Sequence, residues 1–177
     1  MKNPVLKKLY FSPVKSLSFC NTKKLIVKKN IGIKNDRIFA FTRIINEIEA
    51  KEYEINPNKR NLKFFLTLRN SPFLNKYNFE LKDKELSLLF ANQQIKKISL
   101  NDNNNFKILS EELKNREKLK NFNSFLIKNV NFPFFDTMPH NSVSLINLNS
   151  INDFEKKINY KINHERFRGN IYINDIE

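Results

Sequence analysis

The chain has 177 residues, a net charge of +14 at pH 7, 40% hydrophobic residues, 17 Phe and one Cys. This aromatic content is too high for a disordered chain, and a single Cys excludes an internal disulfide framework and any metal site built from several thiolates. No apolar run approaches the ~20 residues of a membrane-spanning helix, and residues 1–8 lack the apolar segment of a signal peptide. We therefore expect a globular, cytoplasmic protein without a membrane span.

The positive charge raises the question of a nucleic-acid partner, because Lys and Arg that bind phosphates release counterions. The basic residues are scattered along the chain in pairs such as Lys28-Lys29 and Lys156-Lys157, and no long block of like charges forms a basic arm. The chain is also rich in Lys, Asn, Ile and Phe, as expected where AT-rich codons dominate. We therefore do not expect nucleic acid as the partner, and a small phosphorylated ligand stays open.

Short apolar runs separated by polar turns predict β-strands in residues 1–100. Asp83-Lys84 is the turn expected for a hairpin between strands at 79–81 and 86–90. The polar segment 46–61 is expected to form a loop or a short helix. The other expected strands cover residues 5–14, 25–28, 36–44, 64–68 and 96–100. Such a series is typical of an antiparallel sheet or a small barrel.

Helical patterns begin after the polar run 101–105, which is the clearest internal boundary. Ser110 is expected to cap a helix that runs to about Lys128, and a strand is expected at 143–148. Asn149 or Ser150 is then expected to cap a second helix, and a last strand follows at 171–173. The apolar stripes that predict the two helices are Leu119, Phe122, Phe125 and Leu126 in the first, and Ile151, Phe154 and Ile158 in the second.

Two segments of the expected β-region are suited to an anion. Lys15 and Ser16 follow the end of the first strand, where a turn can present an ammonium, a hydroxyl and backbone N–H groups. Arg37 can offer a planar fork to a phosphate or a pterin-like ring. The alternatives are an exposed Lys with an ordinary turn Ser, and a surface salt bridge between Asp36 and Arg37.

Arg168-Gly169-Asn170 is a third candidate, because the chain uses Gly only twice. Glycine lets a ligand or another backbone approach closely, with Arg168 as the partner of an anion and Asn170 as an amide that reads a ligand. The alternative is a bulge that enters the last strand. Cys20 lies in an apolar stretch and is expected to be an inert, buried thiol.

Five segments, in order, carry a resemblance to one known family: LYFSPVKSL (9–17), GIKNDRIFAF (32–41), FLTLRNSP (65–72), FFDTMPHNSVSLINLNSINDFE (134–155) and INHERFRGNIYIND (162–175). The chain resembles the MOSC (molybdenum cofactor sulfurase C-terminal) domain proteins, including the β-barrel domain that precedes MOSC in many bacterial members. The resemblance implies a mainly β fold with a few helices (α+β). It also implies a barrel-like domain at 1–100, a polar spacer with a connecting helix at 101–131 and the first part of a MOSC barrel at 132–177.

The resemblance further implies a molybdenum cofactor (molybdopterin) as ligand. By similarity, Lys15 and Ser16 hold its phosphate and pterin, and Arg37 adds a second cation. Arg168 and Asn170 match the family's Arg and Asn at the start of a strand. Ser144 and Asn147 match polar strand-end positions between these segments.

One departure from the family concerns the metal. The family's molybdenum ligand is a Cys well beyond the Arg-Gly-Asn strand, the sequence ends before such a residue, and Cys20 cannot replace it by position. We therefore expect a fragment without metal ligands or catalytic residues, inactive alone. The full-length form would reduce N-hydroxylated compounds, with an electron-donor protein as partner, or carry sulfur. The alternatives are a basic β-domain that binds nucleic acid and a non-catalytic, partner-dependent module.

Overall fold

A computed structural model describes residues 3–17, 19–102, 105–118, 123–135 and 142–174. The described elements are, in chain order, β1 (Val5–Phe11), β2 (Cys20–Thr22), β3 (Val27–Lys28), β4 (Gly32–Ile33), β5 (Phe39–Phe41), α1 (Glu47–Ile55), η1 (Pro57–Lys59), η2 (Leu62–Phe64), η3 (Pro72–Lys76), β6 (Tyr77–Lys82), β7 (Glu85–Phe90), β8 (Gln93–Ser99), α2 (Asn105–Arg116), β9 (Leu126–Lys128), β10 (Leu145–Asn147), α3 (Leu148–Ile158), η4 (His164–Phe167) and β11 (Ile171–Asn174).

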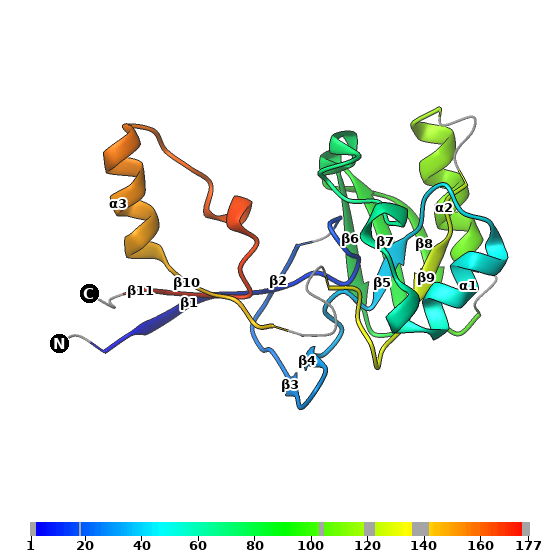
Figure 1. Cartoon of the computed structure of the whole chain (residues 1–177). Helices are drawn as coiled ribbons and strands as arrows, with labels where there is room; N and C mark the ends of the chain where they lie inside the picture. Colours follow the sequence, from blue (N-terminus) through cyan, green and yellow to red (C-terminus); the bar gives the residue numbers. More distant parts are fainter. Residues whose placement is uncertain (1–2, 18, 103–104, 119–122, 136–141, 175–177) are drawn as a thin grey trace.

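The elements form two lobes, which we call the body (β5 to β9 with α1 and α2) and the arm (β1, β10, β11 and α3) (Figure 1). The strand β2 joins them, because it pairs with β1 in the arm and contacts β6 in the body. The Cys20 Sγ donates a hydrogen bond to the Phe79 carbonyl at 3.1 Å, and the Phe19 N–H donates to Asn78 Oδ1 at 3.1 Å.

The core of the body lies between the meander β6-β7-β8, the pair β5-β9 and the helix α2. Alternating residues of the strands, such as Phe79, Leu86 and Leu88, point inward and are fully buried. The helix α2 adds Leu109 and Leu113 from one face. A second apolar cluster covers the other side of β5-β9 beneath α1.

The sheet of the arm has the order β10-β11-β1-β2. The strand β1 is antiparallel to both β11 and β2, whereas β10 runs parallel to β11. One small cluster forms its core, in which Tyr10 and Tyr172 from the sheet meet Ile151 from α3. The helix α3 lies over one face of this sheet (Figure 1).

The expected fold class is confirmed: the protein is a mixed α+β fold, mainly of strands with a few helices. The hairpin at Asp83 is present, and Asp83 has the positive φ of 52° that a tight turn requires. The described strands do not close a barrel. The strand expected at 64–68 is wrong, because η2 ends at Phe64 and Phe65 forms only an isolated bridge with Thr42.

The expected helix from Ser110 to about Lys128 is also wrong in its bounds. The helix α2 begins at Asn105, inside the polar run, and 126–128 forms β9, which pairs with β5. Ser110 lies buried in mid-helix, where its hydroxyl accepts the Leu126 N–H at 3.0 Å. Leu119 and Phe122 lie outside the described residues.

The elements β10, α3 and β11 follow the expectation more closely. The strand expected at 143–148 is β10, and the final strand is β11. The cap of α3 is Asn147 rather than Asn149 or Ser150, and its side chain accepts the Asn149 N–H at 3.1 Å. The division into 1–100, 101–131 and 132–177 stays a prediction.

Candidate anion-binding site

Ser12, directly after β1, connects three segments that lie far apart in the sequence. Its N–H donates to Asp36 Oδ1 at 2.6 Å, and its carbonyl accepts the Arg37 N–H at 2.5 Å. Its hydroxyl accepts a hydrogen bond from Arg168 Nη2 at 3.3 Å. Ser12 is therefore bonded both to the backbone of Arg37 and to the guanidinium of Arg168.

Lys15 is connected to Arg37 through the backbone of Phe134. Its side chain is only 3% exposed, and its Nζ donates to the Phe134 carbonyl at 3.2 Å. The Phe134 N–H donates to the Arg37 carbonyl at 2.8 Å, and the Arg37 Cζ lies 5.0 Å from the centre of the Phe135 ring. Lys15, Arg37 and Arg168 thus share neighbours, and we call these three residues the cation site.

Two carboxylates, those of Asp36 and Glu165, reduce the net positive charge at the cation site. Asp36 is fully buried and forms an ion pair with Arg37. Burial raises the pKa of Asp36, although Arg37 and the Ser12 N–H oppose the rise. Glu165 accepts the Tyr10 hydroxyl at 3.0 Å on the side of the arm. The three cations therefore retain a surplus of positive charge that suits an anion.

The backbone is strained at three of the predicted site residues. Ser16, Arg37 and Arg168 have positive φ values of 63°, 53° and 52°. The left-handed conformation costs a residue with a side chain roughly 1–2 kcal/mol. Eight other non-Gly residues of the described chain also have positive φ, and Arg168 takes this conformation as the C-cap of η4, so the strain alone does not mark a binding site.

Asn170 is buried and joins the site to the sheet of the arm. Its Nδ2 donates to the Tyr10 carbonyl at 3.2 Å, and its Oδ1 accepts the Ser144 hydroxyl at 3.0 Å. The Asn170 side chain also bonds to Asp36, which lowers the pKa of that carboxyl against the effect of burial. Asn170 therefore orients protein groups, and the exposed Ser144 lies beside it.

The structure does not bring Asn147 to the cation site. Asn147 pairs with Ile173 at the far end of β10, whereas Ser144 bonds to Ile171 at the near end. Asn147 lies three positions after Ser144, which is roughly 10 Å along a strand. Ser16 lies next to Lys15 in the turn closed by the hydrogen bond from the Leu17 N–H to the Val14 carbonyl, 3.2 Å long.

Gly169 is needed for packing inside the protein. A Cβ at this position would lie 2.5 Å from Ile146 Cδ1 and 3.3 Å from Tyr172 Cζ. The Gly169 N–H donates to the Tyr172 hydroxyl at 3.0 Å, so the turn before β11 is closed against the strand. The rarity of Gly in this chain suggested that a ligand or another backbone approaches Gly169 closely. In the structure, the Ile146 side chain occupies that position.

Cys20 lies on β2, where its thiol donates to the Phe79 carbonyl. Burial raises the pKa of its thiol to about 11, so the thiolate that a soft metal prefers is disfavoured at neutral pH. The raised pKa is in keeping with the expected inert thiol, although Cys20 is only partly buried. Within the described parts of the chain, no group of His, Cys, Asp and Glu side chains is arranged to hold a metal ion.

Sequence patterns did not point to Arg60, which holds residues 132–134, the segment whose Phe134 carbonyl accepts a hydrogen bond from Lys15. Its Nη1 donates to the carbonyls of Phe132 at 2.7 Å and Pro133 at 3.2 Å, and its Cζ lies 3.9 Å from the Phe134 ring centre. Burial lowers the pKa of Arg60 to about 10. Contacts across more than seventy positions leave no local pattern that could have revealed this role.

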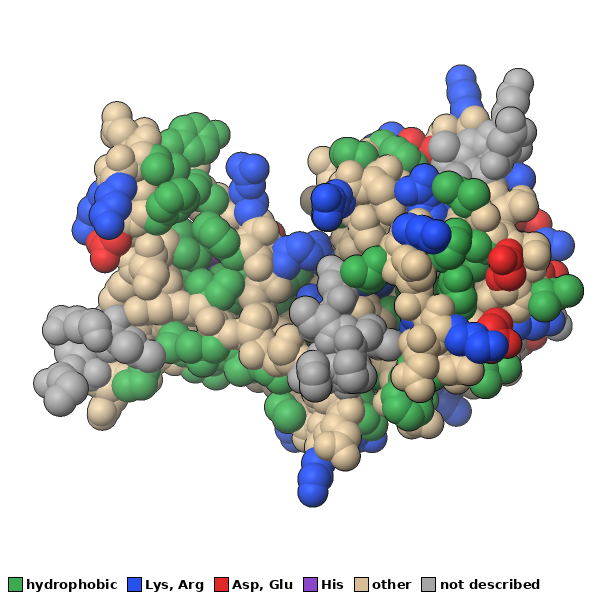
Figure 2. Space-filling model, in the orientation of Figure 1, with side chains coloured by type: hydrophobic (Ala, Val, Ile, Leu, Met, Phe, Trp, Pro, Cys, Tyr) green, Lys and Arg blue, Asp and Glu red, His purple; other side chains and the backbone are tan. Residues whose placement is uncertain are grey.

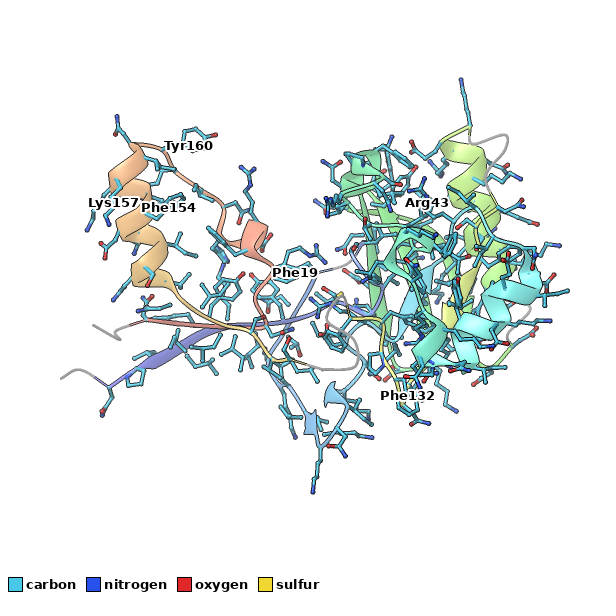
Figure 3. All side chains as sticks on the ribbon, viewed as in Figure 1. Phe19, Arg43, Phe132, Phe154, Lys157 and Tyr160 are labelled. Carbon is cyan, nitrogen blue, oxygen red and sulfur yellow. The ribbon has the colours of Figure 1, made fainter. Side chains whose placement is uncertain are left out.

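Aromatic rings border the cation site on the side of the arm. Phe19 stacks on Tyr10 with ring centres 4.2 Å apart, and the Arg168 Cζ lies 5.4 Å from the Phe19 ring centre. Figure 3 places Phe19 at the junction of the two lobes. An anion with a flat ring system would find both a cation and an aromatic surface here.

Comparison with known proteins finds no match to this chain among family models, curated proteins or solved structures. Membership of the MOSC family therefore stays a prediction from the five segments. Among the described helices, none is both long and apolar enough to cross a bilayer. Lys and Arg side chains are spread over both lobes on the face shown in Figure 2.

Proposed function

We propose that this chain binds a phosphate-bearing pterin cofactor, the molybdopterin of the molybdenum cofactor, at the cation site. The connection of Lys15, Arg37 and Arg168 around the end of β1, through Phe134 and Ser12, carries this proposal. These residues come from three segments more than twenty positions apart, and each belongs to one of the motifs that resemble MOSC proteins. A doubly charged phosphate would complement their surplus charge.

The residues present fit the phosphate and the pterin better than they fit the metal. Arg168 would bind the phosphate through its planar fork, and the buried Lys15, whose Nζ donates to the Phe134 carbonyl, would contribute its charge from behind the surface. Asp36 would hold Arg37 in place through their ion pair. Phe19, which stacks on the buried Tyr10, would offer its outer face to the pterin ring. When bound, the cofactor supplies the redox-active metal, for which Cys20 is unsuited as a ligand.

The activity of the family is a further proposal that rests on this site. That activity is the reduction of N-hydroxylated compounds with an electron-donor protein, or the carriage of sulfur. The described residues support the binding of the cofactor and assign no catalytic group. For this chain the proposal is therefore cofactor binding without turnover.

The proposal can be tested with 6-hydroxymethylpterin phosphate, a stable pterin phosphate, titrated by its fluorescence. Arg168→Gln removes a charged donor, so the affinity should fall about tenfold or more, as expected for the loss of a charged hydrogen bond of roughly 1.5–3 kcal/mol. Arg166→Gln is the matched control, because Arg166 lies two positions away on the exposed surface. The control should keep the affinity of the unaltered chain.

Two further probes separate the possible results. 6-Hydroxymethylpterin without phosphate should bind much more weakly, because it lacks the anion. Equal binding of the two pterins, or an equal loss in both variants, would contradict the proposal. A short DNA duplex that binds with a steep salt dependence, and equally to both variants, would favour the nucleic-acid alternative.

A further inference from the structure

The helix α3 carries an apolar stripe that is longer than the surface beneath it. Ile151 packs against Tyr10 and Tyr172 in the core of the arm. Phe154 and Ile158 follow at i+3 and i+7, so they continue the same face of the helix. Their side chains are 46% and 43% exposed. The far end of the stripe therefore meets solvent.

The end of α3 adds an aromatic residue to this stripe. Asn159 has a φ of 51°, its N–H reaches the Lys156 carbonyl at 3.4 Å, and the Tyr160 N–H donates to the Glu155 carbonyl at 3.2 Å. This is the Schellman arrangement, which turns the residue after the cap back toward the last turn of the helix. Tyr160 is 65% exposed. We call Phe154, Ile158 and Tyr160 the apolar patch.

Cations outnumber available carboxylates around the apolar patch. Asp153 is paired with Lys156 at 3.2 Å, and Glu155 is paired with Lys161 at 2.8 Å. Lys157, three positions after Phe154, forms no ion pair with a carboxylate in the described part of the chain. The surface next to the patch is therefore positive, in keeping with the net charge of +14.

The shape of this region favours a polypeptide over a membrane. Figure 2 shows a notch between α3 and the body, with hydrophobic side chains of the arm facing into it and Lys and Arg side chains on both sides. A flat lipid surface cannot enter a notch. A second copy of this chain would bring the same large positive charge and be repelled. A polypeptide segment with negative charge meets neither obstacle.

We propose that the apolar patch is the docking surface for an acidic polypeptide of another protein, whose Asp and Glu side chains alternate with aliphatic or aromatic ones. The apolar side chains would cover Phe154, Ile158 and Tyr160. The carboxylates would lie near Lys157 and its neighbours, where opposite charge speeds association and excludes basic competitors. Aromatic residues in such a patch contribute most to binding.

A selection from a library of random 16-residue peptides displayed on phage tests this surface with the whole chain as target. The selected peptides should be rich in Asp and Glu together with Leu, Phe or Tyr. Synthetic copies should bind Phe154→Asp about tenfold or more weakly than the unaltered chain, measured by fluorescence anisotropy. Tyr160→Asp, at a more exposed position, should weaken binding in the same way without a risk to folding.

Ile48→Asp is the matched control, because Ile48 is an exposed apolar residue of α1 in the body. It should leave the affinity unchanged. Neutral or basic selected peptides, peptides that bind Phe154→Asp equally well, or a selection without binders would overturn the proposal. Dimerisation, or binding to vesicles of anionic lipid, would also overturn it if either depended on Phe154 while the acidic peptides did not bind.

Discussion

The body buries two apolar clusters around a three-stranded meander, whereas the arm has one small apolar cluster, in which Tyr10 and Tyr172 of the sheet meet Ile151 of α3. The arm instead relies on hydrogen bonds, such as those of the Tyr172 hydroxyl with Gly169 and His164. Hydrophobic burial grows with the buried apolar area, so the two lobes differ in local stability. The arm should open before the body does.

This difference bears on the cation site, because the two lobes share it. Lys15 and Arg37 are held by residues that pack on the body, and Arg168 comes from the turn before β11 in the arm. A ligand that binds all three cations would therefore stabilise the closed position of the arm. The following changes test the comparison, beginning with the largest expected effect.

Phe79→Ala should destabilise the whole protein by about 3–5 kcal/mol. Phe79 is fully buried in the body beside Phe41, with ring centres 5.6 Å apart, and its removal leaves a cavity. Urea unfolding followed by circular dichroism measures the change. Phe132→Ala, at an exposed ring, is the control and should change the stability by less than about 0.5 kcal/mol. Equal effects would show that the body lacks a continuous core.

Tyr172→Phe should destabilise the arm alone by about 2 kcal/mol. The hydroxyl accepts the Gly169 N–H at 3.0 Å and donates to the His164 carbonyl at 2.9 Å, and its removal leaves both groups without this partner. Hydrogen exchange read by mass spectrometry should accelerate in β1 and β11 and stay unchanged in β6 to β8. Tyr160→Phe is the exposed control. Faster exchange in the body would contradict independent opening of the arm.

Ile151→Val should cost the arm about 1 kcal/mol, because it removes one methyl group from the small cluster beneath α3. The same exchange measurement should show faster exchange in α3. Ile48→Val removes the same group from an exposed position of α1 and should have no effect. If the two variants behaved alike, Ile151 would not anchor the helix.

Acid should loosen the end of α3 slightly, through Glu155. The hydrogen bonds from Lys161 and from the Ile162 N–H lower the pKa of Glu155. Because folding lowers the pKa of Glu155, its ionised carboxylate stabilises the folded state fully above the ordinary glutamate pKa of about 4.3. This stabilisation is lost as the pH falls through the lower pKa of the folded state. The effect is small because Lys161 is exposed.

The amide signals of Tyr160 and Ile162 in a ¹H–¹⁵N NMR titration should report this change below about pH 4.3. Glu155→Gln should abolish the titration, whereas Asp153→Asn should leave it in place. A titration that persisted in Glu155→Gln would assign the change to another group.

Local patterns predicted the parts of the fold that depend on neighbouring residues. The turn at Asp83, the face of α3 that carries Ile151, Phe154 and Ile158, and the final strand all follow from spacing and turn chemistry. The fold class and the separate candidates Lys15, Arg37 and Arg168 also came from the sequence. These features need no knowledge of distant segments.

The tertiary structure decided what depends on distant partners. Residues 126–128 continue a helical pattern, yet they form β9 because β5 offers them a strand to pair with. Ser110 suits a helix cap, yet it is buried because its hydroxyl satisfies the Leu126 N–H. Asn147 suits a site residue, yet it caps α3 at the other end of its strand.

The sequence by itself determined the strands with tight turns, the amphipathic last helix and the cationic residues available for an anion. Only the tertiary structure brought Lys15, Arg37 and Arg168 together, through Ser12 and Phe134, across more than 150 positions of chain. The reason is physical: turns and helical faces are set by interactions within a few residues, whereas a site between two lobes exists only after long-range pairing has closed the chain.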